Sequence, residues 1–382
     1  MTVSADQHAA NDVSTISWHE GEVERTVRWQ SESGIKPPKR LLSVDDTLTA
    51  DTAFRLASEG TGLLWRGDYQ NARQLLQAMT RRIERKPRKT SDDPRDAFNL
   101  HRQAQAQRAR TLGMLLMEVD ADHKLALRRA PVIREACLEA YGAVDTPYVV
   151  SLREILGLIG AHEWHRKGVE IATLGARIHP CYGVFSPVRG EYLNLIAQAS
   201  LPSTKLAFDI GTGTGVIAAL LAKRGVDKIV ATDCDARALA CANANVARLH
   251  YTDQVELIEA DLFPAGRAPL IVCNPPWLPA RPNAAIEHAI YDPDSRMLRG
   301  FLDGLAAHLE PQGEGWLILS DLAEHLQLRS RQTLLDMITT AGLKVIDRMD
   351  TRPVHGRATD VSDLLHAARS REVTSLWRLG IA

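Results

Sequence analysis

The stretch that decides the fold is LAFDIGTGTGVIAALLAKRG, residues 206–225. A short apolar run ends at Asp209–Ile210, and Gly211, Gly213 and Gly215 then lead into a second, longer apolar run. Because glycine has no Cβ, the backbone of such a loop can pass close to a ligand, and the following helix offers unpaired N–H groups at its N-terminus. The spacing predicts a strand, a ligand-binding glycine turn and a helix.

The glycine pattern alone fits two ligand classes. Residues 213–218 also match the G-x-G-x-x-A fingerprint of dinucleotide-binding proteins. Asp209 stands directly before the loop, where a carboxylate would repel a pyrophosphate and attract an ammonium group. This acid favours a ligand that carries a positive charge, with a dinucleotide as the alternative.

Short apolar or β-branched runs alternate with helical stretches through the rest of the C-terminal half. This rhythm predicts an α/β fold with a parallel, doubly wound sheet whose ligands bind at the carboxyl ends of the strands. The last run follows the sixth without an intervening helix, which favours an antiparallel strand. The expected strands are 206–210, 229–232, 255–258, 270–273, 316–320, 343–346 and 373–379.

The length of 382 residues is typical of two domains. Residues 1–45 are polar and interrupted by Pro and Gly, so we expect them to be loosely ordered. Residues 46–178 have a helical pattern and are expected to form an α-helical substrate-recognition domain, with a second domain over 179–382. The clearest helix begins after Asp68, a candidate cap, and carries the apolar stripe Tyr69, Ala72, Leu75, Leu76, Met79 and Ile83.

Composition excludes several classes of protein. The chain is 45% hydrophobic and 24% charged, which excludes a disordered protein. Its net charge is −1, so no overall field draws it to nucleic acid or membrane, but residues 71–130 hold 14 basic and 7 acidic side chains. The run RRIERKPRK, residues 81–89, could follow phosphates, although such runs are more often simply solvated. The five cysteines are scattered and form no CxxC pair, which indicates reduced thiols and no metal site. We therefore expect a cytoplasmic protein, and we expect it to have no membrane contact.

Acidic residues follow the second and third expected strands. Asp233 comes 18 residues after Gly215, where a carboxylate can accept hydrogen bonds from both hydroxyls of a ribose. Asp235 is a competitor for that role but is expected to cap the next helix. Asp261 precedes Leu262 and Phe263, so its carboxylate could accept from an adenine amino group while the apolar neighbours cover the ring.

The fourth strand ends in Asn274-Pro275-Pro276-Trp277. Two prolines remove backbone donors and fix φ, so the Asn side chain and the nearby carbonyl groups are held rigidly. Taken with the glycine loop and the acids, this motif resembles the class I S-adenosylmethionine (SAM)-dependent methyltransferases that carry an (Asn/Asp)-Pro-Pro-aromatic motif. These include release-factor glutamine methyltransferases and the RNA guanine-N2 enzymes of the methyltransferase small domain.

The resemblance covers roughly residues 181–380 and implies a Rossmann-like, seven-stranded catalytic domain that uses SAM and needs no metal. It implies that Asn274, Pro275 and Trp277 handle the methyl acceptor. The segment YGVFSPVRGEY, residues 182–192, resembles the stretch that these families place over the cofactor. The expected SAM-binding residues are Asp209, Gly211, Thr212, Gly213, Gly215, Asp233, Cys234, Asp261, Leu262, Asn274, Phe185 and Arg189.

The resemblance also implies chemistry at a planar nitrogen. The Asn274 oxygen and the Pro275 carbonyl would accept N–H groups of the acceptor, while Trp277 would stack on it. A glutamine amide of a protein is the first choice, because the stretch after the motif is long and acidic, with Glu287, Asp292 and Asp294. The alternatives are guanine-N2 or adenine-N6 in structured ribosomal or transfer RNA, then a small-molecule nitrogen, then a nucleotide-binding module without catalysis. The oligomeric state stays open.

Overall fold

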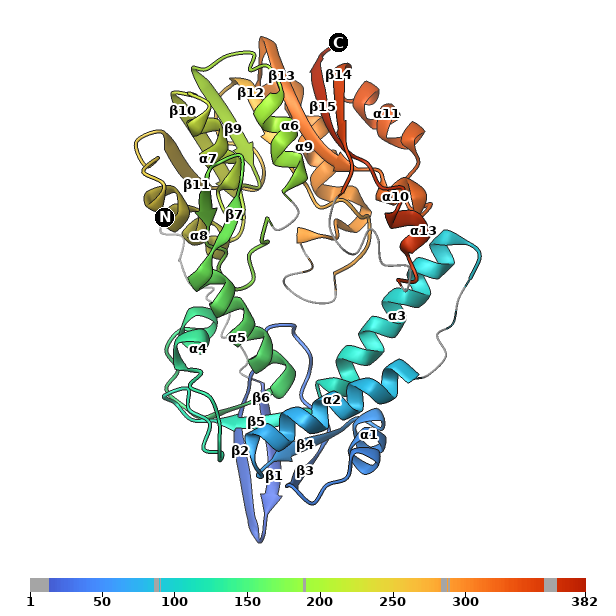
Figure 1. Ribbon diagram of the computed structural model, residues 1–382. Helices are drawn as coiled ribbons and strands as arrows, with labels where there is room; N and C mark the ends of the chain where they lie inside the picture. The colour runs from blue at the N-terminus through green and yellow to red at the C-terminus, as the bar shows by residue number, and fades with distance from the viewer. Residues whose placement is uncertain are drawn as a thin grey trace, which may run out of the picture. The chain divides into compact units, whose positions relative to one another are not determined.

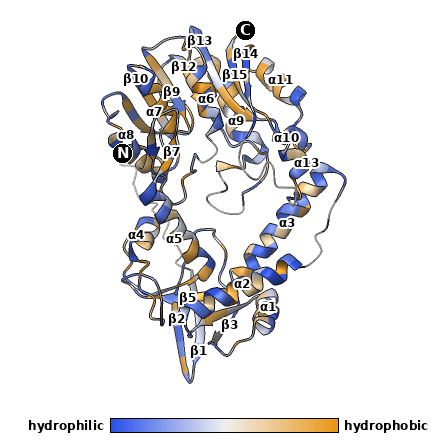
Figure 2. Ribbon diagram, in the orientation of Figure 1, coloured by the Kyte–Doolittle hydropathy of each residue, from blue (hydrophilic) through white to orange (hydrophobic). Residues whose placement is uncertain are grey.

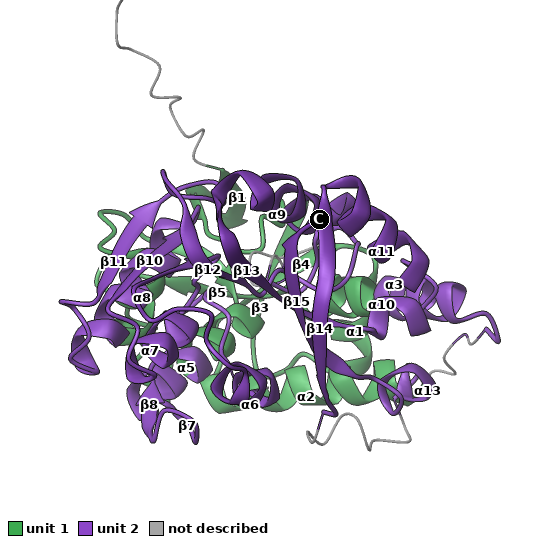
Figure 3. Cartoon of the chain, turned by 90° about the horizontal axis from the view of Figure 1, so that it is seen from above, with its two compact units in different colours: residues 1–87, 105–159 green, residues 88–104, 160–382 purple. Residues whose placement is uncertain are grey.

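The computed structural model describes residues 14–85, 89, 91–187, 190–282, 287, 289–353 and 363–382. The chain forms two compact units, coloured separately in Figure 3: unit 1 is residues 1–87 and 105–159, and unit 2 is residues 88–104 and 160–382. Two helices, α3 (Pro94–Leu112) and α5 (Leu152–Lys167), contribute residues to both units.

Unit 1 is built on a six-stranded mixed sheet of order β1-β2-β6-β5-β4-β3. Strands β3, β4 and β5 run parallel to one another, and β6 pairs antiparallel to β5 and parallel to β2. Its strands are β1 (Thr15–Glu20), β2 (Val23–Trp29), β3 (Arg40–Val44), β4 (Thr61–Trp65), β5 (Leu115–Val119) and β6 (Tyr148–Ser151). Its own helices are α1 (Ala50–Ser58), α2 (Tyr69–Arg85) and α4 (Arg134–Tyr141).

Two sequence expectations for this half are wrong. Residues 46–178 are not an all-helical domain, and residues 14–45 are not loose, because they form β1, β2 and β3. All five residues of β4 are buried, so no polar–apolar alternation distinguishes this strand from a buried helix segment. Strand β1, in contrast, does alternate between exposed and buried residues, and its signal was missed. Helix α2 is as expected: its apolar stripe is buried except for the half-buried Ile83, and Asp68 Oδ1 accepts a hydrogen bond from the Gln70 N–H at 2.8 Å.

Unit 2 contains a seven-stranded sheet of order β11-β10-β9-β12-β13-β15-β14, which confirms the Rossmann-like prediction (Figure 1). Only β15 is antiparallel to its neighbours, as the sequence predicts. The strands are β9 (Leu206–Ile210), β10 (Lys228–Asp233), β11 (Val255–Glu259), β12 (Ala268–Cys273), β13 (Leu309–Ser320), β14 (Leu343–Thr351) and β15 (Thr374–Ile381). A separate hairpin pairs β7 (Val169–Ile171) with β8 (Ala176–Ile178).

Helices cover both faces of this sheet. One apolar core packs α6 (Glu191–Gln198), α7 (Val216–Lys223) and α8 (Ala236–Arg248) against the strands. A second core packs α9 (Arg296–His308) and α11 (Arg331–Thr340) against the opposite face. The short helices η2 (Pro293–Ser295), α10 (Leu322–His325) and α13 (His366–Arg369) complete the unit. In Figure 2 the helices α2 and α3 carry more hydrophilic colour than α7, each of whose residues before Lys223 is buried.

Candidate active site

The sheet order reverses at the junction of β9 and β12. The chain runs from β9 outward through β10 and β11, and then returns to the other side of β9 as β12. Both strands are parallel, with Cys273 opposite Ile210, so Asn274 and Gly211 leave adjacent strands at the same level. Ligands of doubly wound sheets bind at this kind of reversal, outside the carboxyl ends of the strands.

The glycine loop occupies one side of this reversal. Gly211, Gly213 and Gly215 all have positive φ, which favours glycine at each position. A Cβ on Gly211 would meet the Met297 methyl group at 2.5 Å, and one on Gly215 would meet Ala242 at 3.2 Å. A Cβ on Gly213 would meet no described atom within 4 Å, so this glycine faces open space that a ligand can enter.

Asp209 lies beneath the loop and is fully buried. Its Oδ2 accepts hydrogen bonds from the Thr212 hydroxyl at 2.7 Å and from the Ala218 N–H at 3.1 Å. Burial raises the pKa of this carboxyl from 3.8 to about 7, against the opposing effect of those two bonds. Its Oδ1 is buried and has no hydrogen-bond partner among the described residues, so the site retains an unused acceptor that fits a cationic cofactor.

Asp233 ends β10 and holds the loop from the other side. Its Oδ2 accepts from the Gly213 N–H at 3.0 Å, and its Oδ1 accepts from the Asp235 N–H, also at 3.0 Å. Burial raises the pKa of the Asp233 carboxyl. Asp235 caps α8 by accepting from the Arg237 N–H, as expected. Each Asp233 oxygen keeps acceptor capacity for a hydroxyl, because a carboxylate has about four lone-pair sites.

The third acid is already engaged. Asp261 Oδ2 forms an ion pair with Arg296 at 2.6 Å, and both side chains are largely exposed. Leu262 has a φ of +84°, and its carbonyl accepts a hydrogen bond from the Thr232 hydroxyl at 2.5 Å. An adenine amino group at Asp261 would therefore share the carboxylate with Arg296, a partner that the sequence did not reveal. Cys234, the residue after β10, is exposed.

The segment before α6 supplies one describable candidate. Phe185 is half-buried there, next to Val184, which packs with Cys181, Ala238 and Cys241 in a small apolar cluster. Arg189, the other candidate from this segment, lies outside the described residues. The same stretch ends in Tyr192, which is 3% exposed and which the sequence interpretation did not select.

The Asn274-Pro275-Pro276-Trp277 motif follows β12 directly. Asn274 and Trp277 are half-buried, and Pro275 is buried. The Trp277 indole Nε1–H donates to Asn274 Oδ1 at 2.9 Å. The main-chain carbonyl of Trp277 lies 3.5 Å from Nη2 of Arg329. This arginine is only 7% exposed, and its Nη1 donates a hydrogen bond to the Ser295 hydroxyl at 3.2 Å.

The start of α9 corrects a smaller expectation. The sequence Asp292-Pro293-Asp294-Ser295 predicts that Asp294 or Ser295 caps this helix, but Ser295 makes no cap hydrogen bond. Asp292 takes the role instead, because its two oxygens accept from the Met297 and Leu298 N–H groups at 3.0 and 3.1 Å. Asp292 is 5% exposed, and we attribute its position to this cap.

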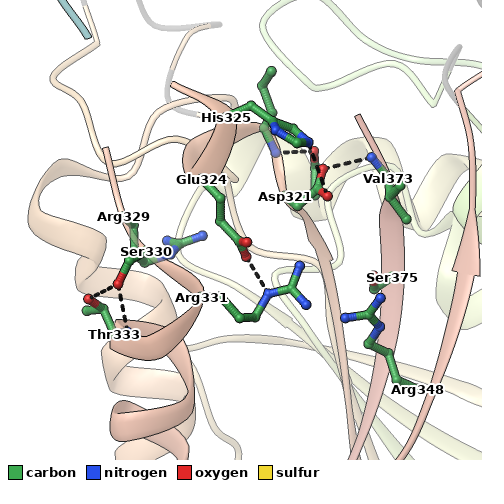
Figure 4. Close-up of polar contacts among 12 residues, drawn as sticks. Asp321, Glu324, His325, Arg329, Ser330, Arg331, Thr333, Arg348, Val373 and Ser375 are labelled. Atoms are coloured by element: carbon green, nitrogen blue, oxygen red, sulfur yellow. Dashed lines mark hydrogen bonds and ion pairs between the residues drawn. The ribbon is translucent and has the colours of Figure 1, made fainter. Parts of the chain in front are cut away.

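A polar network lies at the carboxyl end of β13, one strand beyond the motif (Figure 4). Asp321 accepts from the Val373 N–H at 2.7 Å and lies 3.4 Å from His325 Nε2. Glu324 pairs with Arg331 at 2.6 Å. These bonds join α10 and its N-cap residue Asp321 to the residue before β15 and to the first residue of α11, so they hold the carboxyl end of β13 in place beside the site.

The first half of α3 belongs to unit 2 and packs beside the segment that follows the motif. Phe98 lies edge-on to Tyr291, with ring centroids 6.5 Å apart, and joins an apolar cluster that includes Leu278. The Arg102 guanidinium lies 4.3 Å from the Tyr291 centroid and donates to the Arg281 carbonyl. Sequence reasoning missed this support, because residues 94–104 precede the motif by about 170 positions.

Among the described residues, no helix combines the length and apolar character that a membrane crossing requires. The same residues contain no group of three or more His, Cys, Asp or Glu side chains arranged to hold a metal ion.

Comparison with known proteins identifies the C-terminal half. Residues 177–342 match the methyltransferase small domain family. A tRNA1(Val) (adenine(37)-N6)-methyltransferase of Shewanella amazonensis is 28% identical over 185 residues, 46% of this chain and 76% of the relative. A chain of Methanocaldococcus jannaschii, provisionally named a protein N5-glutamine methyltransferase, is 32% identical over 121 residues, 31% of this chain and 59% of the relative.

Among solved structures, a methyltransferase from Pyrococcus furiosus aligns with 60% of this chain and 99% of its own, with a TM-score of 0.39 and 19% identity. The family match begins in β8, so the strands and helices of unit 1 lie outside it. The domain that carries the glycine loop and the Asn274 motif is thus similar to the methyltransferase small domain family and to a tRNA methyltransferase, and these similarities support a class I SAM-dependent methyltransferase.

Proposed function

We propose that this chain transfers the methyl group of SAM to a planar nitrogen, an amide or an exocyclic amine, at the junction of β9 and β12. The observation that carries the proposal is the pairing of a buried carboxylate–glycine loop with Asn274 at the same level of adjacent strands. SAM supplies a methyl group that its sulfonium has already activated. The remaining work, binding and orientation, falls to the protein.

Each side of the site has a role in this proposal. Asp209 Oδ1 attracts a positive group of the cofactor, Gly213 leaves room for it, and Asp233 accepts from the ribose hydroxyls. Asp261 and Leu262 border the adenine, and Phe185 lies over the cofactor. A cofactor contact of Arg189 stays a prediction from the sequence. Thr212, Gly215 and Cys234 shape the surrounding backbone.

On the acceptor side, the Asn274 oxygen and the Pro275 carbonyl each accept one N–H. These two bonds turn the delocalised lone pair of the nitrogen toward the methyl carbon and stabilise the positive charge that develops there. Trp277 stacks on the planar group, which contributes about 0.5–1.5 kcal/mol beyond area burial for an aromatic pair.

The relatives support adenine-N6 of a transfer RNA as the acceptor. This base amine was an alternative in the sequence interpretation, and two relatives named for this activity align over 76% and 69% of their lengths. Exposed Arg73, Arg81 and Arg85 on α2 could contact phosphates, whereas Arg82 is paired with Asp51 at 2.7 Å. Lys86 and Arg88 of the basic run lie outside the described residues.

A protein glutamine amide, the first choice from the sequence, is the second candidate. The Methanocaldococcus relative supports it with the higher identity, 32%, although over a shorter alignment. A cytoplasmic location, where both kinds of acceptor occur, is part of the proposal.

The test is transfer of a radiolabelled methyl group from SAM into a fractionated lysate, followed by RNase or protease digestion. We expect label in the tRNA fraction, lost with RNase, and recovered as N6-methyladenosine rather than N2-methylguanosine on nucleoside analysis. Label lost to protease would replace the first acceptor with the second. Binding of NAD in calorimetry with no binding of SAM would refute the whole proposal.

A further inference from the structure

The direction in which the Asn274 carboxamide faces decides whether it can act. Its oxygen accepts hydrogen bonds, whereas its NH₂ group only donates. The nitrogen that receives the methyl group carries N–H groups, so it needs the Asn274 oxygen as its hydrogen-bond partner. If the carboxamide were rotated by 180°, its NH₂ group would face those N–H groups instead. The site therefore requires contacts that select one orientation of the carboxamide.

The Trp277 indole provides one of these contacts. An indole N–H can only donate, so the atom 2.9 Å from it must be the Asn274 oxygen. The ring is itself held, because it packs against both apolar cores of unit 2 and its carbonyl contacts Arg329. A Tyr or Phe side chain at this position would have no N–H group to donate.

Tyr192, in the first turn of α6, is a neighbour of both Asn274 and Asp209. It is 3% exposed, and burial, together with the Asp209 carboxylate, raises the pKa of its phenol, so the hydroxyl stays neutral. A neutral phenol oxygen can accept a hydrogen bond from the Asn274 NH₂ group, the only donor that this side chain has.

We propose that Trp277 and Tyr192 together form a clamp that holds Asn274 in the one orientation that can bind a methyl acceptor. The indole N–H uses one lone pair of Asn274 Oδ1, and the second lone pair remains for the acceptor nitrogen. Both are positioning residues in this role, since they act through Asn274. The inference rests on the proposed function for the role of Asn274, and it adds a duty for Trp277 besides stacking.

The experiment compares Trp277→Phe and Tyr192→Phe with two matched controls outside the clamp, Trp164→Phe on α5 and Tyr251→Phe after α8. Trp277→Phe keeps an aromatic face and removes the N–H. With labelled SAM and unfractionated tRNA, we expect each clamp variant to lower kcat about tenfold, with KM for tRNA and the Kd for SAM within about twofold of the wild type. The controls should stay within about twofold of the wild type throughout.

The decisive step repeats Trp277→Phe and Tyr192→Phe in the Asn274→Ala background. Residues that act through Asn274 should have no further effect on the residual rate once it is absent. A further tenfold loss in that background would overturn the clamp, as would a rise in KM with unchanged kcat.

A measurement without an acceptor keeps the inference separate from the proposed function. The chain has seven tryptophans, and Trp277→Phe identifies the indole N–H signal of this one by NMR. We expect slow hydrogen exchange at that N–H in the wild type and faster exchange in Asn274→Ala. Unchanged exchange would refute the clamp even in an active enzyme, whereas tRNA that takes no label would refute only the proposed acceptor.

Discussion

Replacement of Asp209 by asparagine should make the cofactor-free protein more stable at pH 8 and yet weaken its binding of SAM. Burial raises the pKa of this carboxyl to about 7 from an ordinary 3.8. At about 1.36 kcal/mol per pKa unit, this shift corresponds to a cost of about 4 kcal/mol for the ionised form. Because the folded state holds the proton more tightly, wild-type stability falls as pH rises from about 4 to about 7 and is then constant.

The Asp209→Asn variant would keep the shape of the side chain and the acceptor for the Thr212 and Ala218 bonds, and it would carry no charge at this position. The new NH₂ group would occupy the buried position of Oδ1, where an unsatisfied donor costs about 1–3 kcal/mol. The net gain at pH 8 is therefore about 1–3 kcal/mol. Loss of a charge-assisted bond to the cofactor should weaken SAM binding by about 1.5–3 kcal/mol.

Urea denaturation at pH 5.5, 6.5 and 8 measures the first effect, and calorimetry with SAM measures the second. Asp253→Asn, a change at an exposed residue before β11, is the matched control and should alter neither. An identical pH dependence of unfolding free energy in wild type and Asp209→Asn would refute the assigned burial cost. Unchanged SAM affinity in the variant would refute the cofactor role.

Three further variants separate the functions of the site. Asn274→Ala should lower turnover more than tenfold while SAM affinity in calorimetry stays nearly intact; equal loss of both would contradict the acceptor role of Asn274. Asp233→Asn should weaken SAM binding by about 1.5–3 kcal/mol, measured in the same way, and unchanged affinity would move the ribose contact to Asp235. Joint replacement of Arg73, Arg81 and Arg85 by Glu should weaken tRNA binding and flatten its dependence on salt in a filter assay. A protein acceptor would instead leave methylation of that protein unaffected.

The C-terminal half could be predicted from sequence because its signals are local. A glycine loop between a strand and a helix, and a proline pair after another strand, each report their own backbone. The doubly wound order then places Asp209 and Asn274 at one edge of the sheet, as the register of β9 and β12 confirms. The antiparallel direction of β15 followed from a sequence that predicts no helix between the last two strands.

The fold of unit 1 and most side-chain contacts of the site could not be predicted, because they depend on residues that are far apart in the sequence. A short strand with every residue buried, such as β4, has the same apolar pattern as a turn of buried helix, so the sequence predicts a helical domain where the structure has a mixed sheet. No periodic sequence pattern signals a contact between single side chains. Examples are the hydrogen bond between Trp277 and Asn274, the neighbouring phenol of Tyr192, and the ion pair of Asp261 with Arg296. Asp292 replaced the expected helix cap because η2 interrupts the start of α9.

The most direct test of the central claim is a crystal structure of the protein with S-adenosylhomocysteine. We predict that its ribose hydroxyls contact Asp233, that a charged amino group lies near Asp209 Oδ1, and that its sulfur faces the Asn274 side chain. A product bound elsewhere, or bound in this place with the sulfur directed away from Asn274, would contradict the account.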